Sequence, residues 1–189
     1  MLLALVLATP IIGSPAKREE AAAVQPEFEV IPGLGMPSLE SLGLTSADLF
    51  NKTFVDELLA PLAKRAQPEP AALYRRWNNL CYSGGTYGVN DGIWVCAAYL
   101  FALGTKECRA GNKAIIFCSS HARNHYTSVY GISIAPGDSV AHCSESAQGV
   151  YWVPNNCQPG CDGDVCFSAG AAASQGNNNL IMIVNGDYV

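Results

Sequence analysis

Residues 155–166 read NNCQPGCDGDVC, and the three cysteines within ten positions make this the most cysteine-dense stretch of the 189-residue chain. Five more cysteines precede it, and the first 80 residues contain none. The full set is Cys81, Cys96, Cys108, Cys118, Cys143, Cys157, Cys161 and Cys166. An even number of cysteines crowded into one part of a chain is typical of a disulfide framework formed in an oxidising compartment. We expect four disulfides, whose pairing the sequence does not select.

Metal binding is the other common use of clustered cysteines, and the spacing disfavours it. Zinc sites usually contain C-x2-C pairs, whereas Cys157 and Cys161 are spaced C-x3-C and Cys161 and Cys166 are spaced C-x4-C. Asp162-Gly163-Asp164 resembles part of a calcium-binding loop but lacks the downstream glutamate of an EF-hand. We interpret it as a turn and expect neither a metal nor a cofactor.

The N-terminal residues 1–12 are almost wholly apolar and are followed by the small residues Gly13, Ser14 and Ala16. The apolar run is too short to span a bilayer, which takes about 20 residues. Its length and its small-residue ending are typical of a signal peptide, although no Lys or Arg precedes Lys17. We expect residues 1–16 to be a signal peptide, and an uncut N-terminal anchor remains the alternative.

Two dibasic pairs, Lys64-Arg65 and Arg75-Arg76, precede the first cysteine. The residues between them are rich in Ala, Pro and Glu, which favours an accessible linker. The arrangement predicts a pro-segment over residues 17–76 and a mature cysteine-rich domain over residues 77–189. An uncut stalk is the alternative interpretation.

The expected pro-segment has two further features. Apolar residues at helical spacing predict an amphipathic helix from Ser46 to Ala63. Within it, Asn51-Lys52-Thr53 is a glycosylation acceptor sequence, which is used only in a secretory compartment.

The cysteine-rich part predicts an α+β domain with the element order β-α-β-β-α-β-β. The expected strands cover residues 79–86, 113–118, 126–134, 165–173 and 180–184, and the expected helices cover residues 90–103 and 138–153, the second ended by Pro154. This order suggests a disulfide-stapled antiparallel sheet with two helices on one face, a split βαβ arrangement. Asn90 or Asp91 is expected to cap the first helix, and Cys96 and Cys143 are expected to tie the helices to the sheet or to a loop.

Charge excludes one class of function. Residues 77–189 contain four cations and seven anions, a net charge of −3, and show no basic stripe. Because nucleic-acid binding depends on neutralising phosphates, we expect no nucleic-acid partner.

A leader, an acidic pro-segment, dibasic pairs and a cysteine-rich α/β domain together resemble the secreted killer toxins of smut fungi and related fungal effectors. This resemblance is one of layout. It implies an extracellular toxin or virulence effector, released by Kex2-type cleavage, that binds a host or competitor target, either a protein or a cell-wall glycan. It implies no catalytic residue.

Two other functions stay open. A small secreted ribonuclease would use histidines as general acid and base, with a cation near the phosphate, and His121, His125 and His142 together with Arg123 and Glu145 supply these residue types. A cell-wall carbohydrate-binding protein would use aromatic platforms. Candidates for these are Trp77, Tyr82, Tyr87, Trp94, Tyr99, Tyr126, Tyr130, Tyr151 and Trp152, although such residues also fill small cores.

Overall fold

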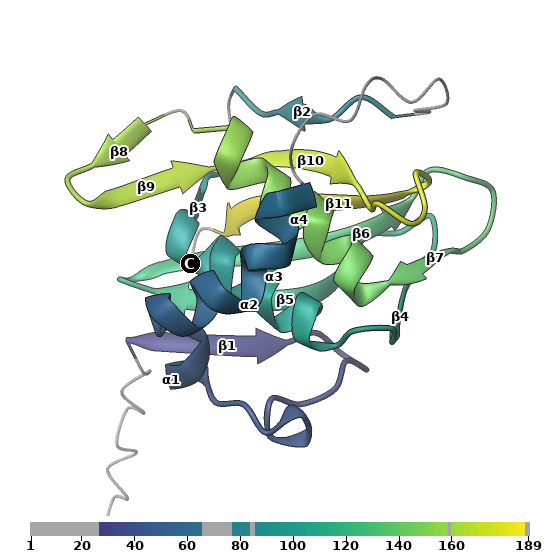
Figure 1. The fold of residues 1–189 in the computed structure, drawn as a ribbon. Coiled ribbons are helices and arrows are strands. Elements are labelled where there is room, and N and C mark those ends of the chain that lie inside the picture. Colours follow the sequence, from purple (N-terminus) through teal and green to yellow (C-terminus); the bar gives the residue numbers. More distant parts are fainter. Residues whose placement is uncertain (1–26, 66–76, 84–85, 159, 188–189) are drawn as a thin grey trace, which may run out of the picture.

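The computed structural model describes residues 27–65, 77–83, 86–158 and 160–187. They form an α+β fold in which helices cover one face of a six-stranded antiparallel sheet (Figure 1). The strand order is β1-β5-β6-β11-β10-β2. Their bounds are Phe28–Pro32 for β1, Ile115–Ala122 for β5, His125–Ser133 for β6, Leu180–Asp187 for β11, Gly170–Ala173 for β10 and Leu80–Cys81 for β2. The predicted fold class is confirmed.

Helix α3, Asn90–Ala102, lies at the centre of the molecule. Nine of its thirteen residues are buried, on every side of the helix. A helix that is apolar all round must be covered all round, and the sheet covers only one side of α3. Val89, not Asn90 or Asp91, is the N-cap residue and makes no side-chain capping bond. The helix ends at Ala102, and Gly104, which follows the C-cap residue Leu103, has a φ of 60° in the left-handed region that glycine adopts readily.

Helix α4, Cys143–Asn156, packs beside α3 and against β10 and β11. Small residues make this contact close: a Cβ at Gly149 would lie 3.0 Å from the carbonyl oxygen of Ala173, on the alanine-rich strand β10. Pro154 was expected to end this helix, but it lies inside the last turn. There its missing N–H affects only one hydrogen bond, and the helix ends two residues later.

Two small sheets complete the cysteine-rich part. Strand β3, Gly88–Val89, pairs with β9, Val165–Ser168, which pairs with β8, Gly160–Asp162. Strand β4, Glu107–Ala110, pairs with β7, Ser139–His142. The sequence prediction missed β3, β4, β7 and β8. It expected a strand over residues 79–86, where the described residues contain only β2, and it merged β9 with β10. These strands have two to four residues each, too few for a period of two to be visible.

All eight cysteines pair, as predicted, and the structure supplies the connectivity that sequence could not. Cys96–Cys118 joins α3 to β5, and Cys108–Cys143 joins β4 to the start of α4. Cys81–Cys157 fastens β2 to the end of α4, and Cys161–Cys166 closes the β8–β9 hairpin. The disulfides therefore fix both helices to their strands.

Residues 27–65, which we call the N-terminal segment, are folded together with the cysteine-rich part. Strand β1 is one of the two edge strands of the large sheet and pairs with β5 from Phe28↔Ala122 to Pro32↔Cys118. A 3₁₀ turn (Glu40–Leu42) and two helices follow, α1 (Ser46–Leu49) and α2 (Lys52–Arg65). These helices replace the single helix expected from Ser46 to Ala63. Figure 1 shows α2 lying over α3, on the side away from the sheet.

The N-terminal segment also supplies part of the hydrophobic core. Val30, Leu49, Val55, Leu59 and Leu62 are all at most 6 % exposed. The interpretation of residues 17–76 as a pro-segment predicted nothing of this kind, and it remains a prediction about processing. Residues 1–26 and 66–76, which contain the expected signal peptide and the Arg75-Arg76 pair, lie outside the described residues.

Among the described residues, no helix is both long enough and apolar enough to cross a membrane.

Candidate functional site: a groove beside helix α2

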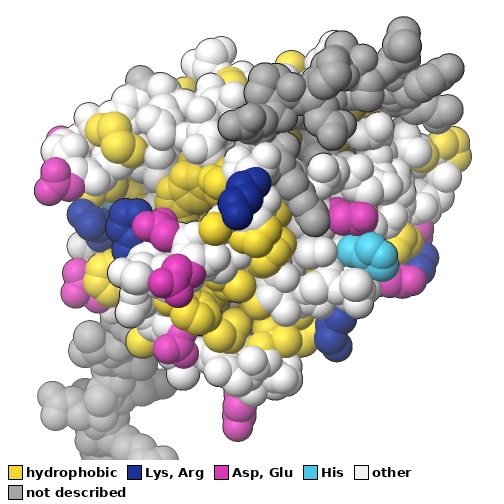
Figure 2. Space-filling view, in the orientation of Figure 1, with side chains coloured by type: hydrophobic (Ala, Val, Ile, Leu, Met, Phe, Trp, Pro, Cys, Tyr) yellow, Lys and Arg dark blue, Asp and Glu magenta, His cyan; other side chains and the backbone are white. Residues whose placement is uncertain are grey.

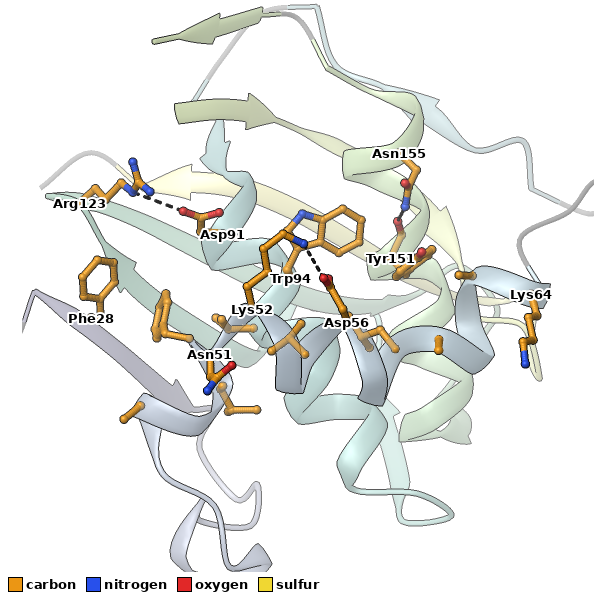
Figure 3. A pocket seen from close by; sticks show the side chains of 18 residues that line it. Phe28, Asn51, Lys52, Asp56, Lys64, Asp91, Trp94, Arg123, Tyr151 and Asn155 are labelled. Carbon is orange, nitrogen blue, oxygen red and sulfur yellow. Dashed lines mark hydrogen bonds and ion pairs between the residues drawn. The ribbon is translucent and has the colours of Figure 1, made fainter. Parts of the chain in front are cut away.

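A groove of about 1,080 Å³ runs between the N-terminal segment and the cysteine-rich part. One wall consists of β1, α1 and α2, and the other consists of α3, α4 and the tip of the β5–β6 hairpin (Figure 3). Its volume is slightly above the usual range of about 300–1,000 Å³ for small-molecule sites. The lining residues with the most to offer a ligand are Phe28, Phe50, Trp94, Tyr151, Asn51 and Asn155, together with the charged residues Lys52, Asp56, Asp91 and Arg123.

Aromatic side chains that are only partly buried line the groove. Trp94 is the half-buried member of the otherwise buried run from Gly92 to Leu100. Its ring meets that of Tyr151 on α4 edge to face, with centroids 4.9 Å apart. Phe28 and Phe50 form a second ring pair on the opposite wall, with centroids 5.0 Å apart. Fixed aromatic rings offer a ligand apolar area at little entropic cost.

Charges surround this aromatic surface in pairs. Lys52 and Asp56 form an ion pair of 2.5 Å on α2, at helical i,i+4 spacing. Across the groove, Arg123 and Asp91 form a pair of 3.3 Å. Figure 2 shows the result: apolar side chains gather in the middle of this face, and Lys, Arg, Asp and Glu stand around them.

The position of Arg123 depends on a tight turn. Arg123 and Asn124 both have positive φ, 52° and 62°, as expected for the central residues of a two-residue hairpin loop. This turn brings the guanidinium of Arg123 over the first turn of α3, where Asp91 also interacts favourably with the helix dipole. The hairpin tip and the helix start therefore form one corner of the groove.

The groove is suited to binding rather than to proton transfer. Its carboxylates are paired with cations and are about half or more exposed, with side-chain exposures of 62 % for Asp56 and 48 % for Asp91. Its walls present aromatic rings, and its edges present amides and charges. Such a surface can hold a ligand that has apolar faces and polar edges, such as a peptide with aromatic side chains or a sugar.

The structure does not bring the three histidines together. His121 and His125 flank the hairpin turn, but His121 pairs with Tyr126 whereas His125 pairs with Ala122. Because neighbouring strand positions point to opposite faces, the two imidazoles lie on opposite faces of the sheet. His121 is buried and stacks on Tyr126, with ring centroids 4.6 Å apart, while His125 contacts Phe167 edge to face.

His142 lies far from the other two histidines and has a local role. It is the last residue of β7, and β7 follows the end of β6 that lies opposite the hairpin tip (Figure 1). Strand β6 itself is about 27 Å long at 3.4 Å per residue. Its Nδ1 is 2.9 Å from the carbonyl oxygen of Thr105, and its backbone N–H donates to the carboxylate of Glu145. His142 and Glu145 thus cap the N-terminus of α4. The residues proposed for a ribonuclease do not form one site.

Three other sequence predictions can be placed. Asn51 is exposed between α1 and α2, and its side-chain oxygen accepts a hydrogen bond from the N–H of Phe54. Its use as a glycosylation acceptor stays a prediction. Lys64 is exposed in the last turn of α2, next to Arg65. Asp162 and Asp164 flank Gly163, which has a φ of 57° in the β8–β9 turn, as the turn interpretation requires.

Comparison with known protein families, curated proteins and solved structures found no match. Trp94 and Tyr151 were among the aromatic candidates from sequence, but their partners Phe28, Phe50 and Lys52 were missed. One signal was present, the alternation Glu27-Phe28-Glu29-Val30, which is a strand pattern.

Proposed function

We propose that this protein is a secreted toxin or effector that binds a host or competitor target through the groove beside α2. The observation that carries the proposal is the aromatic surface that Trp94 and Tyr151 form on one wall of the groove. Two half-buried rings held edge to face on adjacent helices offer a rigid binding surface. The helices that hold them are each tied to a strand by a disulfide, so the surface is preorganised.

The secretory part of the proposal is supported by the complete pairing of eight cysteines within the described chain. Disulfides in such number form in oxidising compartments. The leader over residues 1–16 and the pairs Lys64-Arg65 and Arg75-Arg76 add a route of export and Kex2-type cleavage.

Intact-mass measurement of the secreted product tests this route. The expected product contains a chain that begins at Trp77 and is eight mass units below the mass of its reduced form, two for each disulfide. A chain beginning at Ala66 would assign the cut to Lys64-Arg65 instead. An uncut chain with free thiols would refute both export and processing as proposed.

The groove is tested with a matched pair of tryptophan variants. Trp94 lines the groove, whereas Trp152 is also half buried on a neighbouring helix but does not line it. Labelled protein is incubated with candidate fungal and plant cells, and the bound fraction is measured. We expect Trp94→Ala to lose binding by at least tenfold and Trp152→Ala to retain it. Equal losses in the two variants would contradict a role for the groove.

A cell-wall glycan is the second candidate target. The same ring pair favours it, because aromatic faces stack on sugar rings, and Asn51 and Asn155 offer amides at the groove's edge. Sedimentation with insoluble chitin and β-glucan separates the two candidates. Binding that depends on Trp94 would assign a glycan, and binding only to protein extracted from cells would assign a protein target.

A further inference from the structure

Helix α3 needs the N-terminal segment to complete its burial. The sheet covers one side of α3 through β5 and β6, and α2 lies across the other. Leu59 and Leu62 of α2 are 4 % and 0 % exposed. Val95 on α3 lies on the same side of that helix as α2 and is buried. Without α2, this side of α3 would face water.

Backbone hydrogen bonds also hold the segment on the cysteine-rich part. Strand β1 pairs with β5 over five residues. The ladder continues at Gly33, whose N–H donates a 2.9 Å hydrogen bond to the carbonyl oxygen of Phe117. A Cβ at Gly33 would lie 1.9 Å from the carbonyl oxygen of Ile116, so only glycine allows this approach. The hydroxyl of Tyr99 then donates a 2.6 Å bond to the carbonyl oxygen of Pro37.

No disulfide joins the two parts, because every cysteine lies between residues 81 and 166. The covalent connection is the linker of residues 66–76, which carries Arg75-Arg76 and follows Lys64-Arg65. We propose that cleavage of this linker leaves the N-terminal segment in place as a second, noncovalently bound chain, so that the active protein is a two-chain complex. This inference rests on the proposed processing, and it goes beyond that processing in giving the cleaved segment a lasting role.

The groove supplies the functional reason for retention. Phe28, Phe50 and Lys52 form one wall, and Trp94 and Tyr151 belong to the other. Loss of the segment would remove half of the groove, whereas a retained segment preserves it after cleavage.

The chemistry of the contact predicts how the complex responds to salt. Among the described residues, each ion pair lies within one part: Lys52–Asp56 in the segment, and those of Arg109 and Arg123 in the cysteine-rich part. The attachment depends on apolar burial and on backbone hydrogen bonds, which salt screens little. The two chains should therefore stay together at 0.5 M salt.

The experiment cleaves the linker on demand, so that it does not depend on what the producing cell does. A recognition sequence for a site-specific protease is inserted between residues 70 and 71 of the full-length secreted chain, and both dibasic pairs are changed to alanine. After digestion, a denaturing gel verifies the cut, and native mass spectrometry and size exclusion measure association. We expect both chains at the elution volume of the uncut protein, in low salt and in 0.5 M NaCl.

Two leucine variants make the result specific. Leu62 is 0 % exposed and Leu34 is fully exposed, and both belong to the segment. Leu62→Ala should weaken the association of the cut chains by about 30-fold or more, and Leu34→Ala should not change it. Tyr99→Phe, which removes one hydroxyl and keeps the ring, should weaken it by about fivefold and serves if Leu62→Ala fails to fold.

Separate elution of the segment from the cut protein would overturn the inference. Equal association of the Leu62→Ala and Leu34→Ala proteins would overturn it as well. Failure of the cell to cut its own linker would be seen in the intact mass of the natural product, and it would count against the proposed processing alone.

Discussion

The hydroxyl of Tyr99, on the central helix α3, donates a 2.6 Å hydrogen bond to the carbonyl oxygen of Pro37 in the N-terminal segment. Tyr99 itself is 0 % exposed. A fully buried phenol satisfies its polar end in this way. The bond links the interior of the cysteine-rich part to a residue 62 positions earlier in the sequence, on the other side of the linker.

Tyr99→Phe should lower the free energy of unfolding by about 1 kcal/mol, the usual net value of one hydrogen bond. The ring stays in place, so no cavity adds to the cost. Urea unfolding of the two proteins at pH 7 measures the difference, and Tyr82→Phe, at a half-buried tyrosine, is the control. No measurable difference would mean that the bond to Pro37 does not form in solution.

The same residue predicts a loss of stability at alkaline pH. Burial raises the pKa of Tyr99 from 10.0 to about 12. Between these two pH values the phenol is deprotonated in the unfolded chain but still protonated in the folded protein. The free energy of unfolding therefore decreases as the pH rises. Stability from this group is complete below pH 10 and falls by roughly 1.4 kcal/mol from pH 9 to pH 11. Tyr99→Phe should lack this part of the pH dependence, and identical slopes for the two proteins would contradict it.

The disulfides should differ in their contribution to stability according to the length of chain they close. Cys81–Cys157 spans 76 residues and Cys161–Cys166 spans five. Chain entropy gives about 4–5 kcal/mol for the first and about 2 kcal/mol for the second. Unfolding free energies of the two double alanine variants measure the difference. A larger loss from the hairpin disulfide would show that local geometry, and not chain entropy, sets the order.

The sequence predicted the parts of this fold that carry a long enough period. Helix α3 and strand β6 were found because apolar residues repeat over eight or more positions. Strand β5 was found only from Ile115 to Cys118, because the polar residues that follow were expected to form a loop, whereas the strand continues to Ala122. The N-terminal segment was missed as part of the fold for a different reason. Its apolar spacing predicted a helix, but the dibasic pairs suggested that the segment is cleaved off and lost. No local sequence pattern indicates that Leu59 and Leu62 pack on α3. The all-round apolar surface of α3 was the available signal, since such a helix needs a cover on its outer side.

The candidate site was less predictable than the fold. Phe28, Trp94 and Tyr151 come from three distant parts of the chain, and only the tertiary structure joins them. The histidines illustrate the reverse case. His121 and His125 are four residues apart in sequence, yet the strand period places them on opposite faces.

Gly92→Ala should destabilise the protein even though alanine favours helices. A Cβ at Gly92 would lie 2.5 Å from the hydroxyl oxygen of Ser120 and 2.7 Å from that of Thr127. Both residues are 0 % exposed, so neither has room to withdraw. Overpacking of this kind costs about 1–3 kcal/mol, against a gain of about 1 kcal/mol in helix propensity. Gly160→Ala, where the new Cβ meets nothing within 4 Å, is the control. In thermal unfolding we expect Gly92→Ala to have a lower Tm than the wild-type protein and Gly160→Ala to have the same Tm. A Tm for Gly92→Ala equal to that of the wild type would contradict the close contact.

The histidine arrangement predicts the outcome of a ribonuclease assay. General acid–base cleavage of RNA needs two titrating groups within reach of one phosphate, and the structure places the hairpin histidines and His142 at opposite ends of β6 (Figure 1). We therefore expect the purified protein to leave a labelled RNA uncut, and His125→Ala and His142→Ala to behave identically to it. Arg123→Ala, at the hairpin tip, serves as a control for any effect of lost positive charge. Cleavage that disappears in either histidine variant would identify a catalytic histidine and would replace the binding function proposed for the groove.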